Sequence, residues 1–176
     1  MANVRPEFKV DFANESYTDA EWKLKSQWYI DKLNEVENML QNVHNTGDLV
    51  VACKAMEALL NVVRLDKIYV TQSKERYEQI RKEEEKKCYN IVQQQYEQAG
   101  KKATVDTIKG EVMTYLATKP YANTGIPLVN IVMTTNARSI FVDGILDSLE
   151  DKRNLVISFQ SIFKTENTMS MGGSQT

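Results

Sequence analysis

Residues 49–99 read LVVACKAMEALLNVVRLDKIYVTQSKERYEQIRKEEEKKCYNIVQQQYEQA, with neither proline nor glycine among them. A single helix of this length would extend about 75 Å. Its first half is apolar, its middle from Lys74 to Lys87 is mostly charged, and the apolar seam resumes at Cys88. Because a stretch that is polar on most sides cannot be buried in a compact core, we expect a solvent-exposed coiled coil or a helix that projects between domains.

A first long helix is expected before this stretch, over 18–43. Thr18 and Glu21 have the spacing of a capping box, in which the hydroxyl and the carboxylate each bond the other residue's amide. Gly47 is the expected left-handed stop of this helix, and Asp48 is the expected cap of the next one.

Two helices are expected after it. Gly100 breaks the long helix, Thr104 can cap a short helix over 105–118, and a second long helix covers 128–164. Both long helices have apolar residues at heptad spacing, which is typical of coiled coils and bundles.

The two ends of the chain differ from this pattern. We interpret 1–17 as an extended arm, because apolar and polar residues alternate between Phe8 and Phe12. Such an arm either docks on its own chain or a neighbour, or is disordered. The small polar residues of 165–176 predict a disordered tail, which leaves 18–164 as a single helical domain.

Composition supports a helical fold. The chain has 176 residues, of which 42% are hydrophobic and 26% charged, so it can form a core. Three prolines and seven glycines are too few for the frequent turns of an all-β protein. We therefore predict an all-α fold, in which long helices form a coiled-coil hairpin or bundle with a small helical head near 104–126. Homo-oligomerisation is expected, because these helices expose seams that one chain of this size does not cover.

The same composition narrows the function classes. Cys53 and Cys88 are far apart and are interpreted as reduced thiols of a cytoplasmic protein. No apolar run is long enough for a membrane span, and no signal peptide is expected. Asp143 and Asp147 are too few ligands for a metal site, and no catalytic set surrounds the single histidine, His44. We expect a non-enzymatic protein without cofactor or metal.

A family resemblance enters in the second half of the chain. It is based on two segments: IKGEV at 108–112, followed by Leu116, and FVDGILDSL at 141–149, followed by Arg153. Over roughly 60–162 this pattern resembles the phage UvsY-type recombination mediators. The resemblance implies a small, all-helical, oligomeric protein that binds single-stranded DNA and helps a RecA-like recombinase to load on it. The chain departs from that family in its net charge of −2 and in the glutamine-rich segment 93–98.

Candidate nucleic-acid-binding residues are the cations and one aromatic around the end of the long helix: Lys86, Lys87, Tyr96, Lys101, Lys102 and Lys109. Lysines can contact phosphates, and tyrosines can stack on unpaired bases. The alternatives are a solvated coiled-coil face, since five glutamates lie among the cations of 74–87, and seam packing for the tyrosine.

Candidate residues for an oligomer interface are bulky or apolar and lie on the helical seams: Trp22, Val142, Ile145, Leu149, Val156 and Phe159. Bulky aromatic residues are enriched at subunit interfaces, although a monomer core would use the same residues.

Three functions are compatible with these patterns. The first is a recombination mediator with itself, single-stranded DNA and a recombinase as partners. The second is a structural or assembly protein of a phage particle, such as a neck, scaffold or packaging adaptor, acting through coiled-coil oligomerisation. The third is a small protein that binds one host factor.

Overall fold

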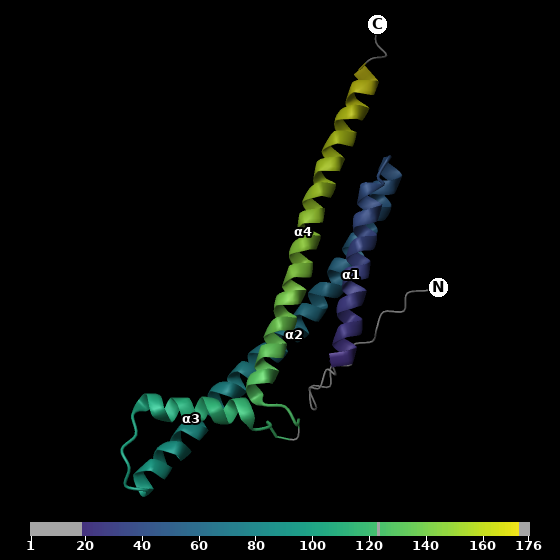
Figure 1. Cartoon of the computed structure of the whole chain (residues 1–176). Coiled ribbons are helices and arrows are strands. Elements are labelled where there is room, and N and C mark those ends of the chain that lie inside the picture. Colours follow the sequence, from purple (N-terminus) through teal and green to yellow (C-terminus); the bar gives the residue numbers. More distant parts are fainter. Residues whose placement is uncertain (1–18, 123, 173–176) are drawn as a thin grey trace. The chain divides into compact units, whose positions relative to one another are not determined.

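The computed structural model describes residues 19–122 and 124–172. Four helices occur in these ranges: α1 (Asp19–Gln41), α2 (Thr46–Gln98), α3 (Val105–Thr118) and α4 (Leu128–Gly172). The same ranges contain no β-strand, only an isolated antiparallel bridge between Pro120 and Pro127. The prediction of an all-α chain is confirmed, and Figure 1 shows the two long helices α2 and α4.

The connection between α1 and α2 differs from the expectation. Asn45 caps α2: its Oδ1 accepts a hydrogen bond from the Asp48 amide at 3.0 Å, and the Asp48 carboxylate accepts one from the His44 amide at 3.1 Å. Gly47 therefore lies in the first turn of α2 and is not a left-handed stop. The helix begins earlier than expected because Asn45 satisfies an amide at its start. The expected cap Thr18 lies outside the described residues.

The C-terminal segment also differs from the expectation. α4 continues past Lys164 to Gly172, so the tail expected to be disordered from Thr165 is helical over most of its length. No proline interrupts this segment, and each residue added to an existing helix gains one backbone hydrogen bond. The predicted N-terminal arm, 1–17, lies outside the described residues.

The single domain expected from the sequence divides into two compact units. The first unit comprises the described residues up to Lys67 together with those from Phe141 onward, and the second comprises Ile68–Ile140. α2 and α4 each contribute a segment to both units, whereas α1 belongs to the first and α3 to the second.

The first unit is a three-helix bundle of α1, the N-terminal part of α2 and the C-terminal part of α4, which run alongside one another (Figure 1). Its buried apolar residues recur at spacings of three and four along each helix: Tyr29, Val36, Leu40, Leu49, Ala52, Met56, Leu59, Leu60, Val63, Val142, Ile145, Leu146, Leu149 and Val156.

This core includes four of the residues assigned to an oligomer interface. Val142 and Leu149 are fully buried, and Ile145 and Val156 are at least 94% buried, within the chain itself. They are not available to a second copy, because α1 and α2 already cover the α4 seam. Trp22 is half-buried and packs edge-to-face on Phe141 with ring centroids 5.7 Å apart.

A buried polar network joins α1 to α2 in this unit. Lys25 Nζ lies 2.6 Å from Asp66 Oδ2, and the Tyr29 hydroxyl donates a hydrogen bond of 2.6 Å to the same oxygen. All three side chains are at least 98% buried. Burying a lysine or an aspartate costs free energy unless the charge is paired, and here each charge offsets the other.

The second unit packs α3 against the C-terminal part of α2 and the start of α4. Its core cluster consists of Tyr77, Cys88, Ile108, Val112, Leu116, Leu128 and Val132. Figure 1 shows α3 folded back along α2 after the loop that joins them. The described helices of both units lack the combination of length and apolar character that crossing a bilayer requires.

Candidate nucleic-acid interface

The loop between α2 and α3 positions the candidate cations of the second unit. Gly100 ends α2 with a φ of +67°, a conformation that suits glycine, and the Lys101 amide donates to the Tyr96 carbonyl at 3.0 Å. Thr104 then caps α3, its hydroxyl oxygen accepting from the Thr107 amide at 3.2 Å. The predicted break at Gly100, the cap at Thr104 and the helix over 105–118 are confirmed.

This hairpin creates a groove between its two helices, with a volume of about 270 Å³. We call it the basic groove, and its lining residues are Lys82, Glu85, Lys86, Tyr89, Lys109 and Val112. Lys82, Lys86 and Tyr89 follow one another along α2 at spacings of four and three, and so share one face of the helix. Val112 is 99% buried, and Tyr89 is half-buried against the core cluster. The packed core thus forms the floor, and lysines from both helices form the walls.

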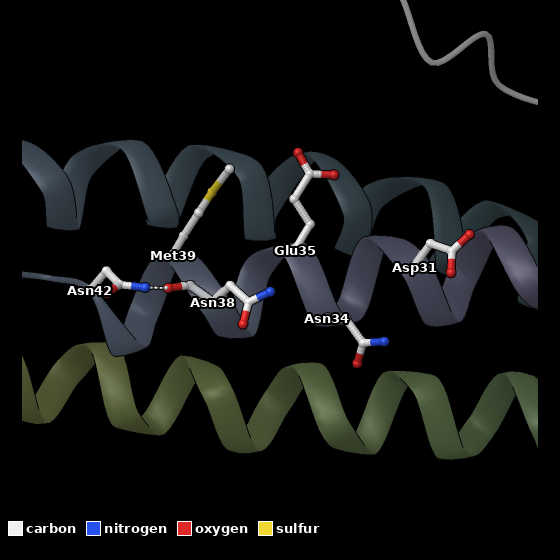
Figure 2. Close-up of a pocket in the computed structure, with 6 residues that line it drawn as sticks. All are labelled: Asp31, Asn34, Glu35, Asn38, Met39 and Asn42. Atoms are coloured by element: carbon white, nitrogen blue, oxygen red, sulfur yellow. Dashed lines mark hydrogen bonds between the residues drawn. The ribbon is translucent and has the colours of Figure 1, made fainter.

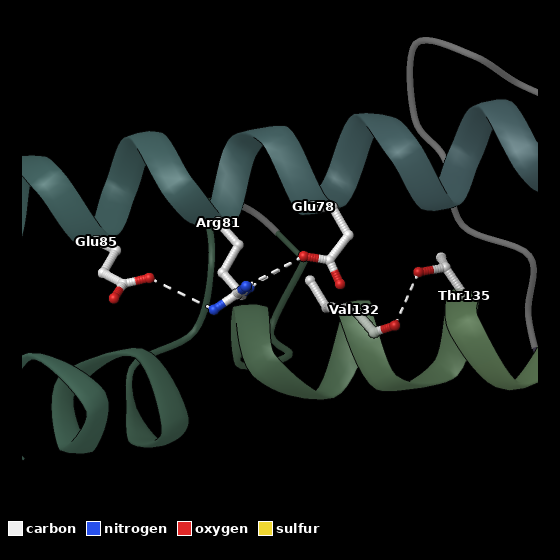
Figure 3. Close-up of polar contacts among 5 residues, drawn as sticks. All are labelled: Glu78, Arg81, Glu85, Val132 and Thr135. Atoms are coloured by element: carbon white, nitrogen blue, oxygen red, sulfur yellow. Dashed lines mark hydrogen bonds and ion pairs between the residues drawn. The ribbon is translucent and has the colours of Figure 1, made fainter.

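The pairing of the neighbouring glutamates decides how much positive charge the basic groove keeps. Arg81 lies between two of them: its guanidinium is 3.2 Å from the Glu78 carboxylate and 3.4 Å from that of Glu85 (Figure 3). Lys87 pairs with Glu84 at 2.7 Å, and this hydrogen bond raises the pKa of the Lys87 ammonium. Glu78, Glu84 and Glu85 are therefore engaged by cations outside the basic groove, whereas Glu83 accepts a hydrogen bond from Gln79.

The groove lysines themselves form no ion pair with any described residue. This holds for Lys82, Lys86 and Lys109. The i,i+4 pair that the sequence favours between Glu78 and Lys82 is replaced by an i,i+3 pair with Arg81. The glutamates of 74–87 thus neutralise only some of the cations in this segment, and the face of α2 toward α3 remains positively charged.

Two of the predicted nucleic-acid-binding residues, Lys86 and Lys109, meet in the basic groove. Lys101 and Lys102 are exposed in the loop between α2 and α3, and Lys87 is engaged with Glu84.

Tyr96 packs within the chain, as the alternative of seam packing predicted, and it also makes a hydrogen bond that the sequence did not suggest. Its hydroxyl donates a hydrogen bond to the Glu111 carboxylate of α3, and its half-buried side chain packs against the core cluster. The hydrogen bond to Glu111, followed by partial burial, raises the pKa of the Tyr96 phenol. Tyr96 therefore links α2 to α3.

Lys82 and Tyr89 line the basic groove but were not among the predicted site residues. Their spacing from Lys86, four residues before and three after, is the signal that could have found them. The packing of α3 on α2, which brings Lys109 close to them, cannot be predicted from the spacing of residues along the sequence.

Two further hollows lie in the first unit. One, of about 580 Å³, is lined by residues of α1 and by Asn42 just after it, mainly asparagines and carboxylates, with Asn42 donating to the Asn38 carbonyl at 2.7 Å (Figure 2). The other, of about 450 Å³, lies between α2 and α4 and includes Cys53, Arg64 and Arg153. Burial, and secondarily Glu57, raises the pKa of the Cys53 thiol, which disfavours the reactive thiolate.

The described residues contain no group of three or more histidine, cysteine, aspartate or glutamate side chains placed to hold a metal ion. Comparison with protein-family models, with curated proteins and with solved structures finds no match to the chain.

Proposed function

We propose that this protein binds single-stranded DNA without catalysing a reaction, and that it acts as a recombination mediator for a RecA-like recombinase. The observation that carries the proposal is the unpaired positive charge on the hairpin of α2 and α3, to which Lys101 and Lys102 in the loop add two exposed cations. The resemblance to the UvsY-type mediators supplies the recombinase as the second partner.

Binding to DNA requires a local concentration of positive charge, because the chain as a whole carries a net charge of −2. Phosphate contacts by lysine displace counterions from the strand, so the affinity falls as salt rises, by a logarithmic slope of about 0.7 per phosphate neutralised on a single strand. A homo-oligomer, which we also propose, would multiply these contacts along one strand.

Fluorescence anisotropy of a labelled oligothymidine, titrated with the full chain at several salt concentrations, tests the proposal. We expect binding at low salt that weakens steeply with added salt and that the substitution pair K101E/K102E reduces. The pair K23E/K54E in the first unit makes the same change in net charge at exposed positions and serves as the control. Absence of binding by the native chain at low salt would overturn the proposal.

A second candidate function, in the assembly of a phage particle, is favoured by one observation. The part of α4 after Asn154 exposes three large apolar side chains, Leu155, Ile157 and Ile162, each about half accessible to solvent. Exposed apolar residues of this kind are found at protein interaction sites. A fixed copy number of the protein in purified virions would favour this function, because a recombination factor should be absent from them.

A further inference from the structure

We infer that the basic groove is a subsite for one nucleotide of a single strand, in which the lysines bind a phosphodiester and Tyr89 stacks on the neighbouring unpaired base. This inference rests on the proposed function and adds the place at which the strand is held. It differs from the proposed function in assigning the main contact to the groove and not to Lys101 and Lys102.

The charge of the basic groove selects an anion. Lys82 and Lys86 project from one face of α2, and Lys109 lines the groove from α3. Each ammonium group offers three hydrogen-bond donors and no acceptor. The single carboxylate in the lining, Glu85, is engaged with Arg81 at 3.4 Å. A phosphodiester, with its negative charge and acceptor oxygens, is complementary to this arrangement.

The floor of the basic groove favours a base beside the phosphate. Tyr89 packs against the core cluster, so it can accept a planar ligand with little loss of conformational freedom. Val112 adds an apolar surface next to it. Stacking on an aromatic side chain tolerates any base, because every base has a π-face.

The size of the basic groove favours an unpaired strand. Its volume of about 270 Å³ is slightly below the roughly 300–1,000 Å³ of pockets for drug-sized ligands, so it suits a group the size of one nucleotide. A base inside a duplex must first leave its stack to reach such a site. We therefore expect preference for single-stranded over double-stranded DNA.

The experiment compares matched variants of the full chain in anisotropy titrations at low salt. The groove variant K82Q/K86Q/K109Q is expected to bind oligothymidine at least about tenfold more weakly and to lower the logarithmic salt slope by about 0.7, as the loss of one phosphate contact would. The control K23Q/K54Q/K119Q removes three exposed lysines outside the groove and is expected to change the affinity less than about twofold.

Stacking is tested by Y89L and Y89F on oligothymidine and on an abasic strand of the same length. Y89L is expected to weaken binding of oligothymidine about tenfold and to leave binding of the abasic strand unchanged, whereas Y89F retains the native affinity for both. Circular dichroism checks that each variant keeps its helical content. If the triple variant does not fold, the three single lysine substitutions replace it, and each is expected to weaken binding.

The possible failures are distinguishable. Equal losses in the groove and control variants would show that only net charge matters, and would overturn the subsite. Native affinity in the groove variant, together with loss in K101E/K102E, would place the strand at the loop; the proposed function would then stand and the subsite would fall. No binding by the native chain would overturn both. Equal weakening of both strands by Y89L would remove the stacking role.

Discussion

Among single residues of the first unit, Asp66 joins two helices through a buried charge. It occupies a position in the apolar seam of α2, between Val63 and Val70, and it is 98% buried. Lys25 and Tyr29 on α1 both bind its Oδ2. A charge at a seam position favours one pairing of two helices, because a shift of register would separate it from the opposite charge on the other helix.

Substituting Asp66 by Asn should lower the free energy of unfolding by about 3–5 kcal/mol, because it removes the negative charge that lies 2.6 Å from the buried Lys25 ammonium. The triple variant K25M/D66L/Y29F removes all the buried polar groups together and should regain most of this loss. Urea denaturation followed by circular dichroism measures both. A D66N variant of native stability would contradict the role assigned to the network.

The exposed ion pair between Lys67 and Asp143, at 2.7 Å, provides the control for this comparison. Both side chains are more than 40% exposed, so water screens their attraction. Substituting Lys67 by Met should change the free energy of unfolding by less than about 1 kcal/mol.

At the level of elements, the glycines differ in backbone conformation and in their place relative to the helix ends. Gly100 has a positive φ at the end of α2, whereas Gly110 and Gly144 lie inside helices. No described atom of another element lies within 4 Å of a Cβ built at Gly110 or Gly144. Neither position is therefore a close crossing between described helices.

These positions predict opposite effects of the same substitution. Gly110→Ala and Gly144→Ala should each raise the free energy of unfolding by about 0.5–1 kcal/mol, since alanine has the higher helix propensity and the added methyl group meets open space. Gly100→Ala should lower it by about 1–2 kcal/mol, because a side chain is strained at positive φ. Thermal denaturation of the three variants checks the signs, and a stabilising Gly100→Ala would contradict the geometry of the loop.

The link between α2 and α3 through Tyr96 and Glu111 predicts a dependence on alkaline pH. The hydrogen bond exists only while the phenol is protonated, so the folded-state pKa of Tyr96 lies above its unfolded value. Its stabilising effect is complete below the unfolded pKa, about 10, and is lost as the pH rises through the folded one.

Absorbance titration of phenolate formation should therefore show one tyrosine titrating at lower pH in the Glu111→Gln variant than in the native chain. Glu97→Gln removes a nearby exposed carboxylate, which accepts a hydrogen bond from Gln93 and none from Tyr96, and should leave the titration unchanged. Identical titrations for all three proteins would show that the contact does not form in solution.

For the whole molecule, the seam of α4 serves the chain's own core. Leu149 has no exposed surface, and it lies in the middle of the first unit. The apolar side chains of Leu155, Ile157 and Ile162 on α4 are instead half accessible to solvent, as are large apolar side chains on the other described helices.

Leu149→Ala should lower the free energy of unfolding by about 2–5 kcal/mol through loss of buried surface and the cavity left behind. Ile157→Ser, at a position 56% exposed, should change stability little and weaken any self-association. Light scattering gives the mass of both variants over a range of concentrations, and a mass that changes in L149A alone would restore Leu149 to the interface.

Much of the architecture follows from the sequence alone. The all-α class, the break at Gly100, the Thr104 cap and the helix over 105–118 depend on propensity, periodicity and capping, which act within a few residues of the chain. The prediction for the start of α2 was wrong: Gly47 was expected to end α1 and Asp48 to cap α2, whereas Asn45 caps α2. Asparagine, glycine and aspartate are all common at helix ends, so residue type alone did not distinguish them.

Only the tertiary structure decided which side chains meet. The partners in the network of Asp66, the cover of the α4 seam and the convergence of Lys109 with Lys82 and Lys86 all join residues from different helices. Periodicity indicates which face of a helix a residue occupies. Which other helix packs against that face depends on the direction that the connecting loops give to the chain. For that reason the sequence named the cations of the hairpin, and the fold selected those that line one groove.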